Sequence, residues 1–505
     1  MNNRLIPKIE KLPHALYTAK QLKYFDRQIF ERFKISEDVM AERAGTAAFK
    51  LAYEKWPEVK TCHVFCGLGK NGEDGFVFAL KAKAAGWNVC VSLVSSNDIS
   101  KNEYGKYANE WISKNETNED LKSLPYDCDL IIDSILGIGL SRVVDGSIKE
   151  AVEVINEHSA PTLSIDIPTG LDSDTGAILG VAVKADITIT FVGLKQGMFS
   201  ADGVDCCGSI FFDSIGIPAA IYASQILSCR RLSWHSQSSF LMPREKSSYK
   251  GNFGHLLVIG GDYGLGGAVR LAGEAALRTG AGLVSVATRE ENIAGLQATR
   301  PEIMAYGINA PEEISDLIQK ADAVVIGPGL GLGNWGRRLV KYVLNRKNKI
   351  IIDADALKIL PGLLADLTQK LNSFIYTPHL GEAEIMGAGS ITDIYSNRFQ
   401  AAETLQKKYS GCVVLKGPGT IISTSAKVPL AICSDGNPGM ASGGMGDALA
   451  GIIGSFYAQN FSARDASELG VCLHSAAADQ AAKSGEKGLL ASDLMPYLKK
   501  LLNKL

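Results

Sequence analysis

The sequence predicts an α/β protein of two domains, each built on a parallel sheet. Two separate series of short apolar strands alternate with glycine loops and helices, which indicates strands joined by crossover helices. The 505 residues suffice for about two or three domains. A polar, serine-rich stretch with little pattern, residues 224–249, separates the two series. We therefore expect one domain over residues 1–225 and a different one over residues 240–505.

The first domain is expected to open with two helices, at residues 18–33 and about residues 38–54. Apolar side chains recur along one stripe of the first helix at amphipathic spacing. They are Leu22, Phe25, Ile29 and Phe33. Short β-rich runs follow, and a glycine loop and a helix join the first two. The strands are predicted at residues 61–66, 88–94, 130–133, 162–166 and 187–191, the loop at 67–75 and the helix at 76–85.

The second domain repeats this alternation from about Gly254 onward. A strand, a glycine loop, a helix and a strand are expected at residues 255–259, 260–267, 268–279 and 283–287. Further strands are expected at residues 323–326, 350–353, 373–376 and 412–415. Because the carboxyl ends of parallel strands meet at one edge of a sheet, ligands bind in the loops there. The loops after these strands are therefore the candidate sites.

Composition and charge exclude several classes of function. A net charge of −2 leaves no basic excess for a nucleic-acid backbone. No apolar run approaches the ~20 residues of a membrane span, and the polar residues 1–13 do not suit a signal peptide. The ten cysteines form no paired CxxC knuckles, so reduced thiols are expected rather than a structural zinc site. We expect a cytoplasmic protein that binds neither nucleic acid nor membrane.

The most informative motif is the run Asn437-Pro-Gly-Met-Ala-Ser-Gly-Gly-Met-Gly-Asp447, which an apolar helix follows. Its clustered glycines let backbone N–H groups converge on an anion, and the helix start adds donors and a positive dipole end. A carboxylate beside a bound phosphate suggests a base that deprotonates a hydroxyl attacking a phosphoryl group. The alternative, a glycine C-cap before an aspartate N-cap, does not need so many glycines.

Other strand-end loops of the second domain can face the same edge as Asp447. They are residues 260–268 (GGDYGLGGA), 327–331 (GPGLG), 377–382 (TPHLGE) and 416–420 (KGPGT). Lys416, set among glycines, is suited to balance the charge of a phosphate. His379 precedes a helix start, where it can donate a hydrogen bond to a substrate or simply cap the helix.

The first glycine loop of the chain, residues 67–72 (GLGKNG), matches GxGxxG after a strand. Alone this is weak evidence for dinucleotide binding, because such a fold also needs an acidic residue after its second strand to hold the ribose. Only Asp98, in a polar loop, could serve. Asn71 and Asp74 instead offer oxygen ligands for a cation.

Two more aspartates of the first domain, Asp133 and Asp166, end predicted strands before glycine-bearing loops. An aspartate at such a place is more often a helix cap than a functional residue. Three loops of this kind at one sheet edge nevertheless favour a site. We expect Asn71, Asp133, Asp166 and Thr169 to converge on one cleft.

These loops resemble the NAD(P)HX epimerase family over about residues 15–220. The motifs that carry the resemblance are Asn71-Gly72-Glu73-Asp74-Gly75, Ile132-Asp133 through Arg142, Ile165-Asp166-Ile167-Pro168-Thr169-Gly170 and Met40-Ala41-Glu42-Arg43-Ala44-Gly45. The resemblance implies a Rossmann-like sheet, a potassium ion held by Asn71, Asp133 and Thr169, and proton transfer by Asp166. It also implies NAD(P)HX contacts at Lys70, Asn71, Gly72, Glu73, Asp74, Gly137, Ile138, Gly139, Leu140, Ser141, Arg142, Val143 and Asp166.

Two positions depart from the pattern of that family. Glu73 stands where the family has a glycine, and Lys70 stands where an asparagine is common. Glu73 is expected to place a negative charge where the phosphates of the substrate pass. Lys70 is expected to offset that charge.

The second domain resembles ribokinase-like nucleotide enzymes, and closely the ADP-dependent NAD(P)HX dehydratases, over about residues 240–500. The motifs are the KGxGT loop from Lys416, the NPGMATGGxGD signature ending at Asp447 with Ser442 for threonine, TPHPGE from Thr377 with Leu380 for proline, and DADAL from Asp353. The resemblance implies ADP with magnesium at Lys416, Gly417, Pro418, Gly419, Thr420 and Gly446. It implies NAD(P)HX contacts at Ala268, Gly329, His379 and Asp447, with Asp447 as the catalytic base.

Domains of these two families in this order are similar to bifunctional NAD(P)H-hydrate repair enzymes. The resemblance implies an isomerase that interconverts R and S NAD(P)HX and a lyase that dehydrates the S form with ADP, releasing AMP and phosphate. A ribokinase-like small-molecule kinase fused to a non-catalytic nucleotide-binding domain is the alternative, and a dehydrogenase is disfavoured by the missing ribose acid. The chain is expected to form a homo-oligomer.

Overall fold

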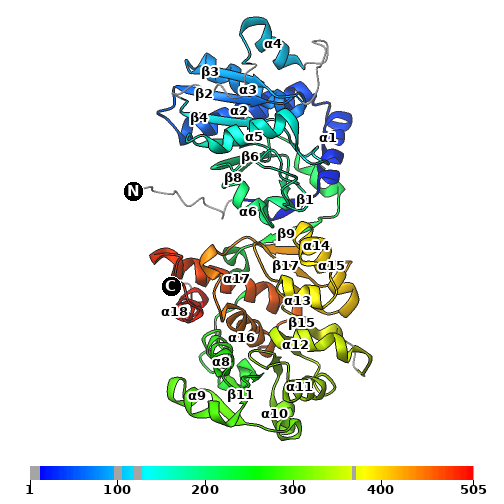
Figure 1. Cartoon of the computed structure of the whole chain (residues 1–505), viewed down its shortest axis with the longest axis vertical. Coiled ribbons are helices and arrows are strands. Elements are labelled where there is room, and N and C mark those ends of the chain that lie inside the picture. Colours follow the sequence, from blue (N-terminus) through cyan, green and yellow to red (C-terminus); the bar gives the residue numbers. More distant parts are fainter. Residues whose placement is uncertain (1–11, 96–104, 119–127, 367–370, 504–505) are drawn as a thin grey trace. The chain divides into compact units, whose positions relative to one another are not determined.

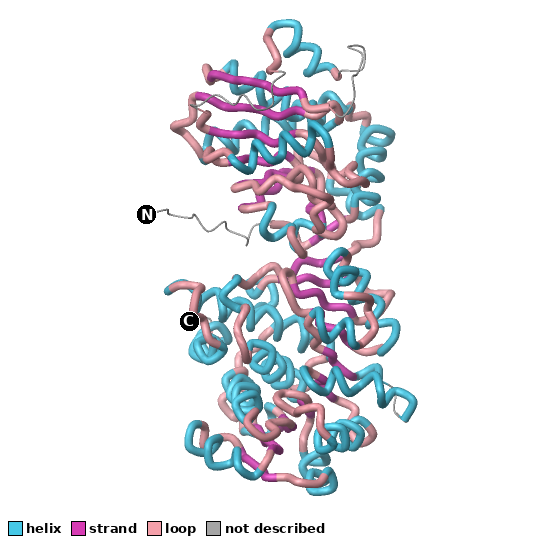
Figure 2. The backbone as a smooth tube through the Cα atoms, viewed as in Figure 1, coloured by secondary structure: helices cyan, strands magenta, loops and turns pink. Residues whose placement is uncertain are grey.

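The computed structural model describes residues 12–95, 105–118, 128–366 and 371–503. Residues 1–11 and Asp98, on which two expectations rest, lie outside these ranges. The chain divides into two compact units, Met1–Cys229 and Arg230–Leu505. The boundary falls inside the polar stretch 224–249. In each unit, strands alternate with helices along the chain (Figure 1, Figure 2).

The first unit contains a parallel sheet with the strand order β3-β2-β4-β5-β6-β8. Its strands are β2 (Thr61–Cys66), β3 (Asn88–Leu93), β4 (Leu130–Ser134), β5 (Thr162–Ile165), β6 (Ile187–Phe191) and β8 (Ser209–Asp213). A short strand, β1 (Ala15–Tyr17), pairs in parallel with β7 (Leu194–Lys195). The helices are α1 (Ala19–Phe33), α2 (Glu37–Lys55), α3 (Lys70–Ala84), α4 (Lys106–Lys114), α5 (Gly146–Glu157) and α6 (Gly203–Cys206).

Helices cover both faces of this sheet, because successive side chains of a strand point to opposite sides. Val64 packs with Phe76 of α3 in the core that also contains residues of α1 and α2. Phe65, one residue along β2, packs with Val152 of α5 in a separate core. The parallel α/β architecture predicted for this domain is confirmed, and all five predicted strands are present.

Helix α3 begins at Lys70, six residues earlier than the predicted helix, so the prediction of a loop over residues 67–75 is wrong from residue 70 onward. Glycines are poor helix formers, which is why this run was expected to be a loop. Here Gly72 has a packing role. A Cβ on it would lie 1.7 Å from the carbonyl oxygen of Gly67. The glycine thus allows the first turn of α3 to sit directly on the loop that follows β2.

The second unit contains a larger sheet with the order β12-β11-β10-β13-β14-β15-β16-β17-β18-β9. Its strands are β9 (Cys229–Leu232), β10 (His255–Ile259), β11 (Leu283–Thr288), β12 (Met304–Gly307), β13 (Ala323–Ile326), β14 (Ile350–Ile352), β15 (Phe374–Tyr376), β16 (Cys412–Leu415), β17 (Thr420–Ser423) and β18 (Leu430–Cys433). Pairings from β12 through β16 are parallel, whereas β16-β17 and β17-β18 are antiparallel. The antiparallel extension was not predicted.

From β10 to β16, helices separate successive strands of the second unit, as expected. They are α7 (Trp234–Gln237), α8 (Gly266–Arg278), α9 (Ile293–Thr299), α10 (Ser315–Lys320), α11 (Asn334–Leu344), α12 (Ala354–Ile359), α13 (Leu380–Ile385), α14 (Ile391–Ser396), α15 (Arg398–Tyr409), α16 (Met445–Ala458), α17 (Ala463–Ala481) and α18 (Met495–Leu502). Helices α8, α16 and α17 share one core with the sheet. A Cβ on Gly451 would lie 2.0 Å from the carbonyl oxygen of Ala272, so a glycine is required where α16 crosses α8. This contact allows the middle of α16 to lie directly against α8.

No helix among the described residues is long and apolar enough to cross a membrane.

Candidate active sites

A cavity of about 1040 Å³ lies in the first unit, at the carboxyl ends of β2, β4 and β5. It is bordered by nearly all the substrate-contact residues predicted for this domain: Lys70, Asn71, Glu73, Asp74, Gly137, Ile138, Gly139, Leu140, Ser141, Arg142, Val143 and Asp166. The exception is Gly72, whose role is the close packing against Gly67 described above. The structure therefore brings the three predicted loops to one place. Of the four side chains expected in one cleft, Asn71 and Asp166 border this cavity, whereas Asp133 and Thr169 do not.

Asp166 follows β5 with a φ of 69°, a left-handed conformation that is unusual for a residue other than glycine. Its Oδ1 accepts a hydrogen bond from Nζ of Lys195 and lies 3.3 Å from the backbone nitrogen of Phe191. Lys195 is almost fully buried and also donates to Thr190 Oγ1 (2.6 Å) and to the carbonyl oxygen of Phe191 (3.2 Å). The backbone of Asp166 is thus strained, and its carboxylate is fixed by a buried ammonium at the wall of the cavity. This combination is typical of a functional site.

Lys195 was not predicted from the sequence. It lies in the short strand β7, which the pattern of apolar residues did not reveal. The available signal was a lysine a few residues after the apolar, β-branched strand β6, between Gly193 and Gly197. A charged residue that such a run buries usually has a specific partner.

Further carboxylates surround this pair. Burial, together with the charges of Asp166, Glu73 and Asp26, raises the pKa of Asp74 well above its usual range, although Lys195 opposes the shift. Burial also raises the pKa of Asp26, where Lys70 opposes the shift and Asp166 adds to it. When several carboxylates lie close together, their mutual repulsion favours keeping a proton on one of them. The cavity can therefore hold and exchange protons beside a bound molecule.

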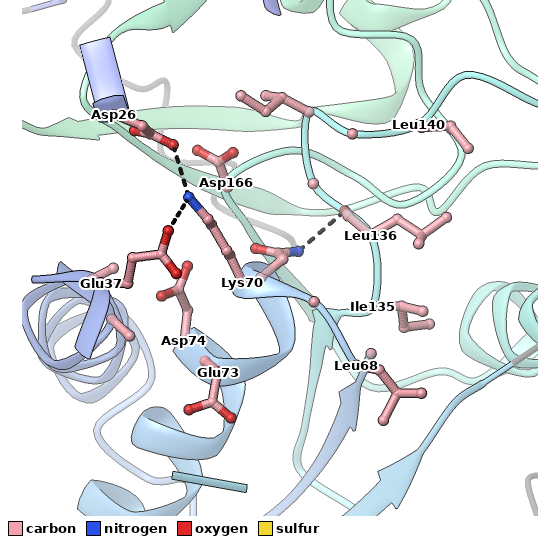
Figure 3. Close-up of a pocket in the computed structure, with 18 of the residues that line it drawn as sticks. Asp26, Glu37, Leu68, Lys70, Glu73, Asp74, Ile135, Leu136, Leu140 and Asp166 are labelled. Atoms are coloured by element: carbon pink, nitrogen blue, oxygen red, sulfur yellow. Dashed lines mark hydrogen bonds and ion pairs between the residues drawn. The ribbon is translucent and has the colours of Figure 1, made fainter. Parts of the chain in front are cut away.

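Lys70 and Glu73 do not interact as the sequence suggested. Lys70 Nζ lies 2.8 Å from Glu37 Oε1 and 3.6 Å from Asp26 Oδ2 (Figure 3). Figure 3 shows Glu73 directed away from Lys70. Its carboxylate accepts hydrogen bonds from the backbone N–H groups of Tyr107 (2.9 Å) and Ala108 (3.1 Å). The expectation that Lys70 offsets the charge of Glu73 is therefore wrong, because each side chain has other partners.

The three predicted potassium ligands form one connected group. Thr169 donates from Oγ1 to Asp133 Oδ1 (2.6 Å) and from its backbone nitrogen to Asp133 Oδ2 (2.8 Å). Thr169 Oγ1 accepts the N–H of Leu136 (3.0 Å), whose carbonyl oxygen accepts the amide of Asn71 (3.1 Å). This leaves the buried Oδ1 of Asn71 without a hydrogen-bond partner among the described residues. An orphaned amide oxygen, linked through Leu136 and Thr169 to a buried carboxylate, suits an oxygen-liganded cation.

Asp133 itself is fully buried. Burial raises its pKa, although hydrogen bonds from Thr169 and Ser164 favour the ionised form. Within the described ranges, the structure holds no group of three or more His, Cys, Asp or Glu side chains placed to bind a metal ion. A cation here would therefore be held mainly by neutral oxygen atoms and a single carboxylate.

In the second unit, Lys416 lies among carboxylates at the end of β16. Its Nζ is 2.9 Å from Asp353 Oδ1 and 3.7 Å from Glu382 Oε2. Thr377 Oγ1 donates to the same oxygen of Asp353 at 2.7 Å. Burial opposes the charge of Lys416, but Asp353, Glu382 and Asp447 outweigh it, so the pKa of Lys416 is raised. The lysine therefore stays charged and available to an anion.

Asp447 lies in the first turn of α16, whose N-cap Gly444 has a φ of 85°. It is therefore not the N-cap that the alternative interpretation required. Burial and the charge of Asp353 raise the pKa of Asp447 to about 7, although Lys416 opposes the shift. A Cβ on Gly446 would lie 3.2 Å from Lys416 Nζ, so the lysine reaches the glycine beside Asp447. A carboxyl with a pKa near neutrality suits a general base.

The remaining predicted contacts lie on neighbouring loops. Gly329 has a φ of 56°, and a Cβ on it would lie 3.1 Å from the Cβ of Ala268, so these two residues are brought together. His379 caps α13, because its Nδ1 accepts the N–H groups of Gly381 (3.0 Å) and Glu382 (3.3 Å). Burial lowers the pKa of His379 despite Glu382. The neutral ring then carries its proton on Nε2, which lies 3.3 Å from Oε1 of Glu382.

The KGPGT loop is held by a residue that the sequence did not indicate. Arg398, at the start of α15, is fully buried. Its guanidinium donates to the carbonyl oxygens of Pro418, Gly419 (2.9 Å) and Leu415 (3.4 Å). A Cβ on Gly417 would lie 2.9 Å from its Nη2. The loop after β16 is thus shaped around a buried arginine, which also explains the glycine that follows Lys416.

Two family models match the chain. The first, described as YjeF-related protein N-terminus, matches residues 37–197, and the second, NAD(P)H-hydrate dehydratase, matches residues 256–500. The matches fall in the unit with the cavity and in the unit with Asp447, respectively.

Relatives match nearly the whole chain. A bifunctional NAD(P)H-hydrate repair enzyme Nnr of Coxiella burnetii is 40% identical over 496 residues, with 97% of this chain and 99% of the relative covered. The enzyme of the same name from Escherichia coli is 39% identical over 494 residues, with 97% and 95% covered. A solved ribokinase-like superfamily protein of Enterococcus faecalis is 32% identical at a TM-score of 0.50, covering 55% of this chain and 97% of its own.

Proposed function

The chain belongs to the family of bifunctional NAD(P)H-hydrate repair enzymes, and we propose that each of its two units carries out one step of that repair. The first unit interconverts the R and S epimers of hydrated NADH and NADPH. The second unit dehydrates the S epimer with ADP. The observation that carries the proposal is the placement of Asp447, with a pKa of about 7, beside Lys416 at the glycine-rich start of α16.

The dehydration step follows from that geometry. Asp447 takes the proton of the hydroxyl on C6 of the dihydronicotinamide, and this oxygen attacks the β-phosphorus of ADP while the bond to AMP breaks. Lys416 and the backbone N–H groups at the start of α16 balance charge on the transferred oxygens. The phosphate then leaves C6 with its bonding electrons, and loss of a C5 proton restores the dinucleotide. The products are NAD(P)H, AMP and phosphate, and magnesium is proposed to accompany the ADP.

In the first unit, the substrate would occupy the cavity of about 1040 Å³. Asp166 is proposed to transfer protons during epimerisation, with Lys195 fixing its carboxylate. The surrounding carboxylates, including Asp74, provide further proton carriers. Epimerisation would allow a stereospecific dehydratase to consume both forms of the damaged cofactor.

Recovery of absorbance at the reduced-nicotinamide band tests both activities. The full-length protein is given mixed R and S NADHX with magnesium, potassium and either ADP, ATP or no nucleotide. We expect complete recovery with ADP, faster than spontaneous epimerisation allows. If only the absorbance that corresponds to the S epimer is recovered, the first unit does not act as an epimerase. No recovery with either nucleotide would favour the alternative of a small-molecule kinase.

We also propose that potassium binds at Asn71, Asp133 and Thr169, supported by the orphaned Oδ1 of Asn71. Asn71→Ala removes one neutral oxygen ligand, so the potassium concentration that half-activates epimerisation should rise by roughly tenfold or more. Epimer interconversion without ADP, followed by chromatography across a potassium series with tetramethylammonium as the balancing ion, measures this. An Asn71→Ala enzyme with an unchanged potassium response would place the ion elsewhere, and the dehydratase rate of the same sample controls for protein quality.

The cytoplasm is the proposed location, supported by ten free cysteines, nine of them buried, which suit a reducing compartment. A homo-oligomer stays a prediction that light scattering of the purified chain would test.

A further inference from the structure

The carboxylate of Glu73 is bound to the start of a different helix. Glu73 belongs to the first turn of α3, yet its two oxygens accept the N–H groups of Tyr107 (2.9 Å) and Ala108 (3.1 Å) in the first turn of α4. N–H groups there have no partner within their own helix. The N-cap of α4 is Gly105, which has no side chain to bind them. Glu73 therefore supplies the missing cap from outside, with the helix dipole favouring its charge.

The backbone of α4 is shaped to receive this carboxylate. A Cβ on Gly105 would lie 2.3 Å from the carboxyl carbon of Glu73. Any side chain at position 105 would therefore displace the carboxylate or the helix. Elsewhere α4 is held by Trp111, which is 1% exposed and lies under Nζ of Lys83 of α3 at 5.4 Å. Helix α4 is thus attached to the rest of the unit in two ways: by the hydrogen bonds of Glu73 and by the burial of Trp111. We call the hydrogen bonds of Glu73 to α4 the attachment.

This attachment adjoins the cavity. Glu73, Gly105 and Lys106 all border it, so the start of α4 forms part of its wall. Glu73 also shares the first turn of α3 with Lys70 and Asn71. The carboxylate keeps its charge, but the two N–H dipoles directed at it partly offset its field, so it repels a phosphate less than an unpaired carboxylate would. This arrangement contrasts with the expectation that Glu73 obstructs the path of the substrate.

We propose that Glu73 is a positioning residue of the epimerase, which holds the start of α4 in place as a wall of the substrate cavity. The inference rests on the proposed function of the first unit. Because a wall shapes binding more than the chemical step, loss of the attachment should raise KM much more than it lowers kcat.

The test compares Glu73→Ala, Glu73→Gln and Gly105→Ala in the full-length chain. Glu73→Ala should raise the epimerase KM on the order of tenfold or more, because two charge-assisted hydrogen bonds are lost. Gly105→Ala should have a similar effect by displacing the carboxylate. Glu73→Gln keeps one acceptor oxygen and should lie between wild type and Glu73→Ala. Backbone hydrogen exchange across residues 106–114 should be slowest in the wild type, faster in Glu73→Gln and fastest in Glu73→Ala and Gly105→Ala.

The glutamine variant separates positioning from simple electrostatics. Glu73 raises the pKa of Asp74, and both Glu73→Ala and Glu73→Gln remove that charge. Equal effects of the two variants, seen as a common shift of the pH profile, would mean that the charge matters and not the attachment. Glu110→Gln is the matched control, because Glu110 lies on α4 in an exposed pair with Lys114 at 3.0 Å. It should leave both KM and exchange unchanged.

The outcomes also separate this inference from the proposed function. Faster epimerisation by Glu73→Ala would show that Glu73 obstructs the cavity, and unchanged exchange would show that it does not hold α4; either result overturns the inference. A wild-type chain that dehydrates S NADHX but does not epimerise would overturn the epimerase function and with it the positioning role. In that case exchange would still report whether the attachment exists.

Discussion

Asp447→Asn should reduce dehydratase turnover by about 10²-fold or more, because the variant cannot accept the proton of the C6 hydroxyl. The amide has nearly the same size and keeps the start of α16 and its glycines intact. Binding of ADP and of the substrate should therefore survive, so kcat falls and KM changes little. The measurement is the ADP-dependent recovery of NADH absorbance from pure S NADHX. A variant that keeps near-normal turnover would show that another group is the base.

The pH dependence of the wild type provides the second line of evidence on Asp447. Its pKa is raised to about 7, so the carboxyl is mostly protonated below pH 7 and ionised above it. A base must be ionised, and dehydratase kcat/KM should therefore rise with pH through about 7 and level off above. Asp447→Asn should lose this rise. Epimerase activity of Asp447→Asn at one fixed pH serves as the control for protein quality, because its cavity lies in the other unit.

Asp166→Asn should lower the epimerase rate by about 10²-fold or more, because it removes the proposed proton carrier. Asparagine is the suitable replacement at this position. Asp166 has a φ of 69°, and asparagine adopts this left-handed conformation more readily than most residues. Lys195 keeps its bonds to Thr190 and Phe191, so the unit should still fold. Chromatography of R and S NADHX without ADP measures the rate, and dehydration of the S epimer should stay normal.

Lys195 gives that prediction an independent check. Lys195→Met removes the buried donor that fixes the carboxylate of Asp166, so it should also slow epimerisation. If the two residues act as a unit, the double variant should be scarcely slower than Asp166→Asn alone. If the rate losses of the two single variants instead multiply in the double variant, Lys195 has a role separate from that of Asp166. An Asp166→Asn enzyme with at least half of the wild-type rate would exclude Asp166 as the proton carrier.

Much of the fold could be predicted from the chain. The strands at residues 61–66, 187–191, 255–259 and 412–415 have the predicted bounds, because each is a short run rich in apolar and β-branched residues that follows a polar residue or a glycine. The start of α3 could not be predicted. Propensity treats Gly72 as a reason for a loop, whereas the carbonyl of Gly67 that occupies the space of a side chain is visible only in the folded chain.

The order of residues along the chain was enough to predict two α/β domains, the loops at their sheet edges and the residues with local signals, such as Asp447 among its glycines. Such features depend on neighbours in the chain, so a single sequence contains them. The partners of those residues became visible only in the folded chain. Lys195 fixes Asp166 across 29 positions, Asp353 pairs with Lys416 across 63, and Glu73 caps a helix 34 positions away. Those pairings are set by how strands and helices pack within each unit, and pairwise contacts over such distances leave no periodic trace in a sequence.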